Sequence, residues 1–270
     1  MRAALFCGGL NQTGADAIIR TSDPKPPQGR REGAIFSMTD LELRKRAAEI
    51  AAQLRDETVS DEEILRQVWE EPELIRAACL SGANLFLEAV ADKRFPVAQA
   101  LREMGADIHW TCRASLFNGN ALNVARTPRE ADRLLEWGVE IERNLSLHIS
   151  KPFKNPAIMA ALHNDAPMLL YWLAKQKELF ADDPQYVGEL FYAAINTASM
   201  MNQSDTLACI LADDRLFAIL KEVYAGTDDL NSVRLYLSAL RRIGGEKLEP
   251  RKKELRKILN QKKKELSAGE

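Results

Sequence analysis

From Thr39 onward, apolar residues return along the chain at intervals of three and four, which is the pattern of an amphipathic helix. The first such segment carries Leu43, Ala47, Ile50 and Leu54 on one face. No stretch of useful length alternates apolar and polar residues as a half-buried strand does. We therefore predict an all-α fold built from short helices of about 8–14 residues.

Polar residues that can cap a helix mark where these helices are expected to begin. The T/S-x-x-E spacing of a capping box occurs at 39–42, 60–63 and 127–130. Asp183 stands before Pro184, which suits a cap followed by the first helical turn. The pattern therefore predicts several separate helices rather than one long coiled coil.

Two segments of the chain align with each other. These segments are 84–108 and 120–141. Ala125 lies 36 residues after Ala89, whereas Gly138 lies 33 residues after Gly105, so the second segment lacks three residues between its two predicted helices. Each unit has an alanine on a short first helix and large aliphatic residues on a second. The glycine that follows suits a left-handed position at a helix C-terminus.

These residues resemble the ankyrin repeat family. The family's T-P-L-H-x-A motif aligns with 84–89 and 120–125, and more weakly with 155–160. Its G-A-D-[VI]-N ending aligns well with 105–109 and loosely with 138–142. The resemblance implies a solenoid of stacked helix pairs in which inner helices line a concave face and loops project as fingers. Ankyrin-like proteins usually bind other proteins there.

The predicted organisation has four parts. We expect a disordered tail or a mis-assigned start at 1–37, an N-terminal helical cap at 38–80, an ankyrin-like repeat domain at 81–245 and a basic C-terminal helix at 246–270. Met38 directly precedes the first capping box, so translation starting there is the alternative explanation of the upstream segment. After residue 180 only the alternation of small and large apolar helices remains.

Composition narrows the functional classes. The 37 basic and 39 acidic residues nearly cancel, so no overall field calls for nucleic acid or an anionic membrane. The four cysteines lack C-x-x-C spacing and are interpreted as reduced, mostly buried thiols of a cytoplasmic protein. The apolar stretches are too short to span a bilayer. We expect a soluble monomer that binds no cofactor.

The chain offers little that is typical of a catalytic site. The three histidines have neither H-x-x-x-H nor H-E-x-x-H spacing, so no zinc site is expected. The acidic pairs 182–183, 213–214 and 228–229 lie where helices should begin, and we interpret them as caps rather than as acid–base groups. Lysines 262–264 suit a solvated helix face, with phosphate binding as the alternative.

The resemblance also places candidate partner-binding residues. Trp110 and Arg113 fall on the first predicted finger, Glu142 and Arg143 on the second, and inner-helix positions facing the groove are Glu88, Asn123 and Arg126. An exposed tryptophan at a finger tip would be typical of an interface hot spot. The alternative is that Trp110 folds back onto Leu116 or Phe117 and only closes the loop.

We therefore expect a non-catalytic protein that binds another protein through its concave face and fingers. One alternative is a helical nucleic-acid-binding module that uses the basic C-terminal helix. Another is an enzyme whose site assembles from residues far apart in sequence. A third is a structural subunit that oligomerises through the stripe at 169–173 or through the last helix.

Overall fold

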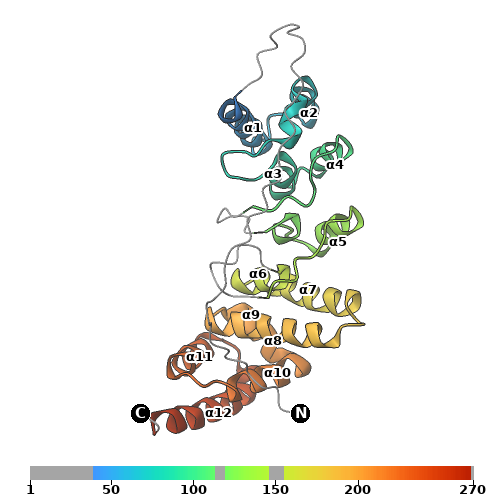
Figure 1. The fold of residues 1–270 in the computed structure, drawn as a ribbon. Helices are drawn as coiled ribbons and strands as arrows, with labels where there is room; N and C mark the ends of the chain where they lie inside the picture. The colour runs from blue at the N-terminus through green and yellow to red at the C-terminus, as the bar shows by residue number, and fades with distance from the viewer. Residues whose placement is uncertain (1–38, 113–118, 146–154, 269–270) are drawn as a thin grey trace, which may run out of the picture. The chain divides into compact units, whose positions relative to one another are not determined.

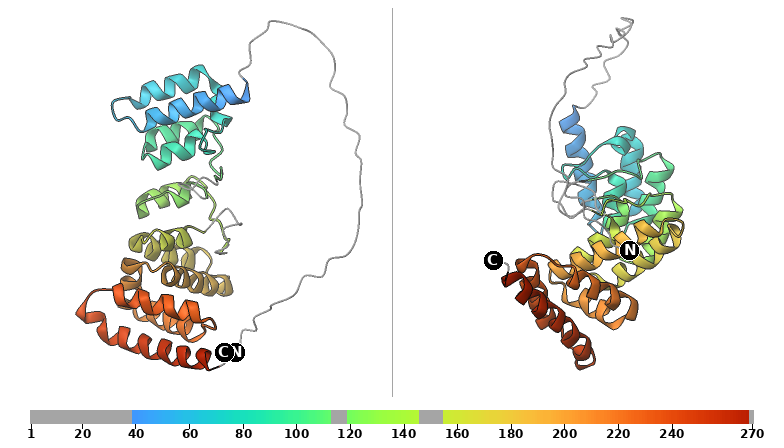
Figure 2. Two further views of the ribbon diagram at one scale, coloured as in Figure 1. Left: turned by 90° about the vertical axis from the view of Figure 1, so that its left-hand side faces the viewer. Right: turned by 60° about the horizontal axis from the view of Figure 1, so that its bottom comes forward.

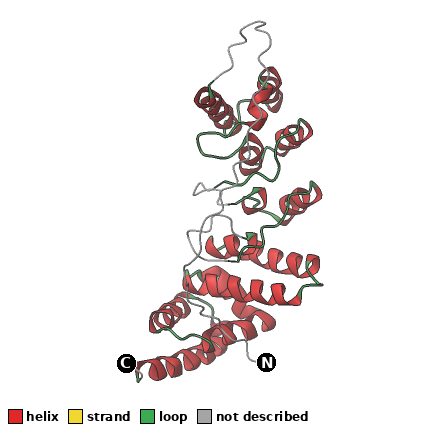
Figure 3. Ribbon diagram, in the orientation of Figure 1, coloured by secondary structure: helices red, strands yellow, loops and turns green. Residues whose placement is uncertain are grey.

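The computed structural model describes residues 39–112, 119–145 and 155–268, and the described part of the chain is helical, with no β-strand (Figure 3). The α-helices are α1 (Asp40–Leu54), α2 (Asp61–Glu70), α3 (Leu85–Ala91), α4 (Phe95–Glu103), α5 (Pro128–Glu136), α6 (Pro156–Leu162), α7 (Ala166–Leu179), α8 (Pro184–Met200), α9 (Ser204–Ala212), α10 (Asp214–Ala225), α11 (Leu230–Arg242) and α12 (Glu249–Ser267). Three 3-10 helices are η1 (Pro72–Arg76), η2 (Ala121–Asn123) and η3 (Glu246–Leu248). The all-α prediction is confirmed.

All described residues belong to one compact unit of the chain, 38–270. The segment predicted as a disordered tail or mis-assigned start lies outside the described residues, and so does Met38. The predicted range of helix lengths is wrong at both ends. The helices α3 and α6 have 7 residues, whereas α8 has 17 and α12 has 19.

Most of the predicted helix starts are confirmed by hydrogen bonds. Thr39 Oγ1 accepts from the backbone N–H of Glu42, whose carboxylate accepts from the backbone N–H of Thr39 at 2.8 Å. The same reciprocal pair starts α5 at 127–130. At α2 only half of the box forms, because the Glu63 carboxylate pairs with Arg66 at 2.7 Å instead. Asp183 caps α8, as its position before Pro184 predicts.

The acidic pairs also act as caps. Asp183, Asp213 and Asp229 each accept a hydrogen bond from a backbone N–H in the first turn of α8, α10 and α11, at 3.0, 2.8 and 2.7 Å. A carboxylate at this position satisfies an otherwise free amide and interacts favourably with the helix dipole. The capping interpretation of these three residues is confirmed.

A buried asparagine closes each of the two aligned units in the same way. Asn84 starts α3 and Asn120 starts η2, and the Oδ1 atom of each accepts from a backbone N–H of its own first turn, at 2.9 and 3.0 Å. The Nδ2 atoms donate to the carbonyls of Asp107 and Glu140, at 2.8 and 2.7 Å. Each carbonyl lies two residues beyond the glycine that ends the unit. The start of the unit is thus tied to its end.

The glycines that end these units have the predicted left-handed backbone. Gly105 and Gly138 have φ of +94° and +92°. In both cases the next residue, Ala106 or Val139, donates its N–H to a carbonyl five residues back, at 2.9 and 3.0 Å. Only glycine adopts this conformation without a cost of about 1 kcal/mol, which explains its presence directly after the C-cap residues of α4 and α5.

The three-residue deletion predicted from the alignment lies in the turn between the two helices of the second unit. In the first unit the turn passes through Lys93, which has φ of +62°, and the first residue of α4 is six residues from Ala89. In the second unit Ala125 is three residues from the first residue of α5, and Arg126 leads directly into the Thr127 cap. Its first helix is also reduced to the single 3-10 turn η2.

Contacts between elements run along the chain in sequence. The first helices contact one another in the order α1, α3, η2, α6 and α8, and α2 contacts α4 as α7 contacts α9. Figure 1 shows α3 beside α4, and α6 beside α7. Beyond α8 the arrangement changes, because α10 and α11 both pack against α8 and α12 (Figure 2). Leu255 and Leu259 of α12 are fully buried.

One continuous core of buried apolar side chains links these elements. Trp172 and Tyr224 are among its largest members, and Trp137 packs between Phe86 and Phe95, with ring centroids 6.1 Å from each. Burial raises the pKa of the Cys79 thiol to about 12, which keeps this thiol protonated and unreactive.

Candidate functional site

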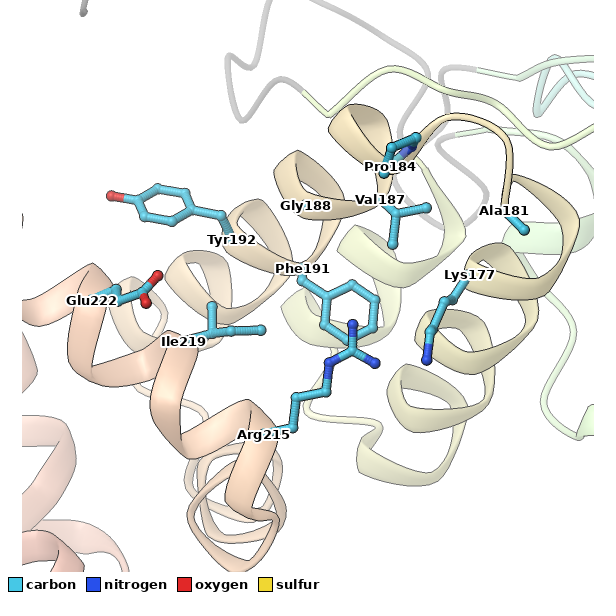
Figure 4. Close-up of a pocket in the computed structure, with 10 residues that line it drawn as sticks. All are labelled: Lys177, Ala181, Pro184, Val187, Gly188, Phe191, Tyr192, Arg215, Ile219 and Glu222. Carbon is cyan, nitrogen blue, oxygen red and sulfur yellow. The ribbon is translucent and has the colours of Figure 1, made fainter. Parts of the chain in front are cut away.

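An open groove lies between α7, α8 and α10. Its volume is about 410 Å³, and its walls are mostly apolar. Val187, Phe191 and Tyr192 come from α8, and Ile219 comes from α10 (Figure 4). Phe191 and Val187 are largely buried, whereas Tyr192 is 45% exposed. A large aromatic side chain at the rim of an apolar groove is typical of a surface that binds another molecule.

Gly188 keeps the groove open from the side of α8. It lies in the interior of a helix, where glycine is less favourable than alanine by about 0.5–1 kcal/mol. Its backbone has no left-handed φ, and a Cβ atom added there would meet no atom within 4 Å. Neither the backbone conformation nor a close packing contact therefore requires glycine at this position. A longer side chain at 188 would project into the groove.

Charged side chains stand at both ends of the groove. Lys177 reaches into it from α7 and Arg215 from α10, and Figure 4 shows both charged groups near the ring of Phe191. The Arg215 guanidinium lies 4.9 Å from the centre of that ring. Neither cation forms an ion pair with any carboxylate of the described residues. Glu222 lines the other end, near Tyr192 (Figure 4).

A buried polar cluster fixes the walls of the groove behind its surface. Asn155 and Gln176 exchange two side-chain hydrogen bonds, at 2.7 and 3.0 Å. The Tyr186 hydroxyl donates to Gln176 Oε1 at 2.9 Å. Because buried polar networks hold a defined geometry when all members are bonded, this cluster sets α7 relative to α8. In this unit the Gln176 side chain takes the place of the backbone carbonyl that Asn84 and Asn120 bind at the end of their units, because α7 continues through position 177 without a glycine turn.

Arg143 fixes the N-terminal end of α8. Its guanidinium donates to Asp183 at 2.6 Å and lies 4.7 and 4.2 Å from the ring centres of Phe180 and Tyr186. The backbone N–H of Tyr186, and then Arg143, hold the pKa of Asp183 below its usual value. Arg143, predicted to bind a partner from the second finger, makes these contacts within the fold while its side chain stays 49% exposed.

The other predicted finger residues have different surroundings. Trp110 is half-buried, and its Nε1–H donates to the carbonyl of Gly82 at 2.9 Å. The indole thus packs onto the segment before α3, rather than standing alone at a finger tip. Glu142 is half-buried and accepts from the backbone N–H of Asn144 at 2.9 Å. Arg113 lies outside the described residues, as do Leu116 and Phe117.

The three predicted inner-helix residues differ in how exposed they are. Glu88 is 1% exposed, and its carboxylate accepts from Arg55 at 2.7 Å and from Ser81 at 2.6 Å. A buried carboxylate needs such partners, so this side chain belongs to the interior and is not free to face a groove. Asn123 is 9% exposed and packs close to Gly119. Arg126 is exposed, next to His163, and is the one of these three predicted residues that is accessible.

The sequence patterns did not single out the groove between α7, α8 and α10. Its residues come from three helices in the part of the chain where the resemblance is weakest. One signal was present, namely Gly188 within a helical apolar pattern, because an isolated glycine inside a helix often has a packing or functional reason.

The remaining observations bear on metals, membranes and relatives. Among residues 39–112, 119–145 and 155–268, no group of three His, Cys, Asp or Glu side chains is placed to hold a metal ion. No helix in that part of the chain has the length and apolar character needed to cross a bilayer.

The chain matches no model of a known protein family, and no curated protein matches it.

Proposed function

We propose that this chain is a non-catalytic, ankyrin-like repeat protein that binds another protein. The observation that carries the repeat assignment is the tie from Asn84 to Asp107 and from Asn120 to Glu140. An asparagine Nδ2 donates to a backbone carbonyl in both units, across 23 residues in the first and 20 in the second. That difference equals the deletion in the intervening turn, so the two units are copies of one supersecondary structure.

The order of contacts supports the stacking of such units. A helix pair of this size cannot bury its apolar face alone, and neighbouring pairs must cover it. The contacts from α1 through α3, η2 and α6 to α8 are those of consecutive pairs packed in a row. The turns that end α3, α6 and α8 are alike, with a left-handed residue at Lys93, Asn164 and Asn202. We infer a solenoid over this part of the chain.

The groove between α7, α8 and α10 supports binding as the function. It combines exposed Tyr192, an apolar floor, an opening kept free by Gly188 and charged residues at its ends. Of the predicted partner-binding residues, Arg126 and Arg143 remain candidate contacts because both are exposed. We propose that a protein partner docks on the groove, that the protein acts in the cytoplasm, and that it is a monomer until the partner binds.

A substitution that fills the groove tests this proposal. Gly188→Met favours the helix and projects a side chain into the groove, so the fold should be retained while partner binding is lost. Ala52→Met on α1, an exposed helical position away from the groove, is the matched control. The assay is quantitative mass spectrometry of proteins captured from native host extract by each full-length variant. We expect a protein captured by the unsubstituted chain and by Ala52→Met to be lost with Gly188→Met. Equal recovery of that protein by the unsubstituted chain and both variants would contradict the proposal.

A further inference from the structure

The groove between α7, α8 and α10 also indicates what kind of segment the partner presents. We propose that it binds a short peptide segment in which an apolar side chain is accompanied by a carboxylate. This proposal rests on the proposed function and specifies the ligand of the same site. It is carried by the charges of Lys177 and Arg215, the apolar floor between them and Glu222, and the opening at Gly188.

The size of the groove suits one or two apolar side chains. Its volume of about 410 Å³ falls at the lower end of the range typical of ligand pockets, roughly 300–1,000 Å³. The floor formed by Val187 and Phe191 is apolar and already largely buried in the fold. Closing the groove would remove Tyr192 and Ile219 from water, which favours an aliphatic or aromatic ligand side chain.

The two cations define the polar part of the ligand. Lys177 and Arg215 come from different helices, line the same groove and have no carboxylate partner among the described residues. Arg215 is held against the ring of Phe191, which places its guanidinium beside the apolar floor. A carboxylate between these two side chains would gain a charge-assisted hydrogen bond from each. A neutral or basic group would not.

Glu222 gives the ligand a direction. It lies seven residues, or about 10 Å of helix, beyond Arg215 on α10. An extended peptide covers that distance in about three residues. Glu222 repels an acidic group at its own end and favours a basic one. The ligand is therefore a segment with its acidic group near Arg215, apolar side chains in the middle and a neutral or basic residue about three positions away.

The carboxylate has two sources in a protein, namely an acidic side chain and a free C-terminus. The first is represented by the peptide acetyl-Glu-Leu-Phe-Lys-amide and its control acetyl-Gln-Leu-Phe-Lys-amide. The second is represented by acetyl-Lys-Phe-Leu with a free carboxylate, compared with the same peptide as its amide. Each pair differs only in the group that Lys177 and Arg215 would bind.

Titration of the full-length protein with these four peptides, followed by amide shifts in ¹⁵N-resolved NMR spectra, tests the proposal. We expect the peptide with a carboxylate to bind about three- to tenfold more tightly than its neutral control in at least one pair, because each exposed charge pair contributes a modest amount. The shifted amides should include Gly188 and Arg215. Equal affinity within both pairs, or shifts confined to other parts of the fold, would overturn it.

Variants separate the charge effect from the groove itself. Arg215→Gln and Lys177→Gln should each remove about half of the free-energy advantage of the carboxylate and leave the neutral peptides unchanged, whereas Lys175→Gln, whose lysine pairs with Asp132, should leave it intact. Gly188→Met should abolish binding of all four. The inference fails if the unsubstituted protein shows no carboxylate advantage. It also fails if the advantage is as large in Arg215→Gln and Lys177→Gln as in the unsubstituted protein. The proposed function still stands in that case if Gly188→Met loses the captured partner. If Gly188→Met retains that partner, the proposed function fails together with the inference.

Discussion

The Asn84 side chain offers a direct test of how a helix pair is held together. It is completely buried, accepts a hydrogen bond from the Leu87 N–H at 2.9 Å and donates one to the Asp107 carbonyl at 2.8 Å. Replacing Asn84 with alanine removes both bonds. The first loss leaves the start of α3 without its cap, and the second releases the segment that follows Gly105.

The expected cost follows from these two losses. Removing an N-cap costs about 1 kcal/mol. Losing the bond to Asp107 adds about 1 kcal/mol, the lower part of the usual range for an unsatisfied group, because Asp107 is exposed and water replaces part of the interaction. We therefore expect Asn84→Ala to lower the free energy of unfolding by about 2 kcal/mol. Asn84→Ser keeps an acceptor for the cap but cannot reach the carbonyl, and should cost about half as much.

Urea unfolding of the full-length variants, followed by circular dichroism, gives these free energies. Asn231→Ala serves as the control because Asn231 is exposed on α11, and its substitution should change stability by less than about 0.5 kcal/mol. Amide exchange should be accelerated most in α3 and α4 of Asn84→Ala. A loss below about 0.5 kcal/mol, or equal losses for Asn84→Ala and Asn84→Ser, would refute the role of the tie.

Gly105, Trp110 and His163 each allow a test of the local structure around them. Gly105→Ala should lower the free energy of urea unfolding by about 1 kcal/mol because Gly105 has a positive φ. Gly244 has open space around it and no left-handed φ, so Gly244→Ala should change the free energy of unfolding little. Equal effects of the two substitutions would contradict this reasoning. Trp110→Phe should cost about 1 kcal/mol through loss of the bond to Gly82, and an unchanged melting temperature would place the indole in solvent. Partial desolvation, and then the charge of Arg126, lower the pKa of His163 below 6.5, so NMR should show it titrating below that value. Because the pKa of His163 is higher in the unfolded chain than in the folded one, the unfolded chain binds more protons as the pH drops below 6.5. The free energy of unfolding should therefore fall over that range, and His163→Asn should lose this pH dependence.

Local features of the fold were predictable from the sequence because they depend on neighbouring residues. The capping boxes at 39–42 and 127–130 involve residues three apart, and the left-handed turns at Gly105 and Gly138 follow from the backbone freedom of glycine. The deletion between the aligned units was also visible in the spacing of alanines and glycines. These features establish short helices and their order, and the ankyrin-like assignment built on them remains a proposal.

Tertiary features were not predictable, because they depend on residues distant in sequence. Nothing near Glu88 indicates that Arg55, the C-cap residue of α1 and 33 residues away, is its charge partner and keeps it in the interior. The reciprocal bonds of Asn155 with Gln176 likewise appear only when α6 and α7 are packed. The groove needs three helices, so no single segment of the sequence encodes it.

Hydrogen exchange of the full-length protein, alone and bound to its captured partner, tests the central claim most directly. If a partner docks on the groove, amides of α8 and α10 should exchange more slowly in the complex, with the largest change around Gly188, Tyr192 and Arg215. Amides of α1 and α2 should be unaffected. Protection confined to α1 and α2, or none in α8 and α10, would contradict the account of this protein as one that binds its partner at that surface.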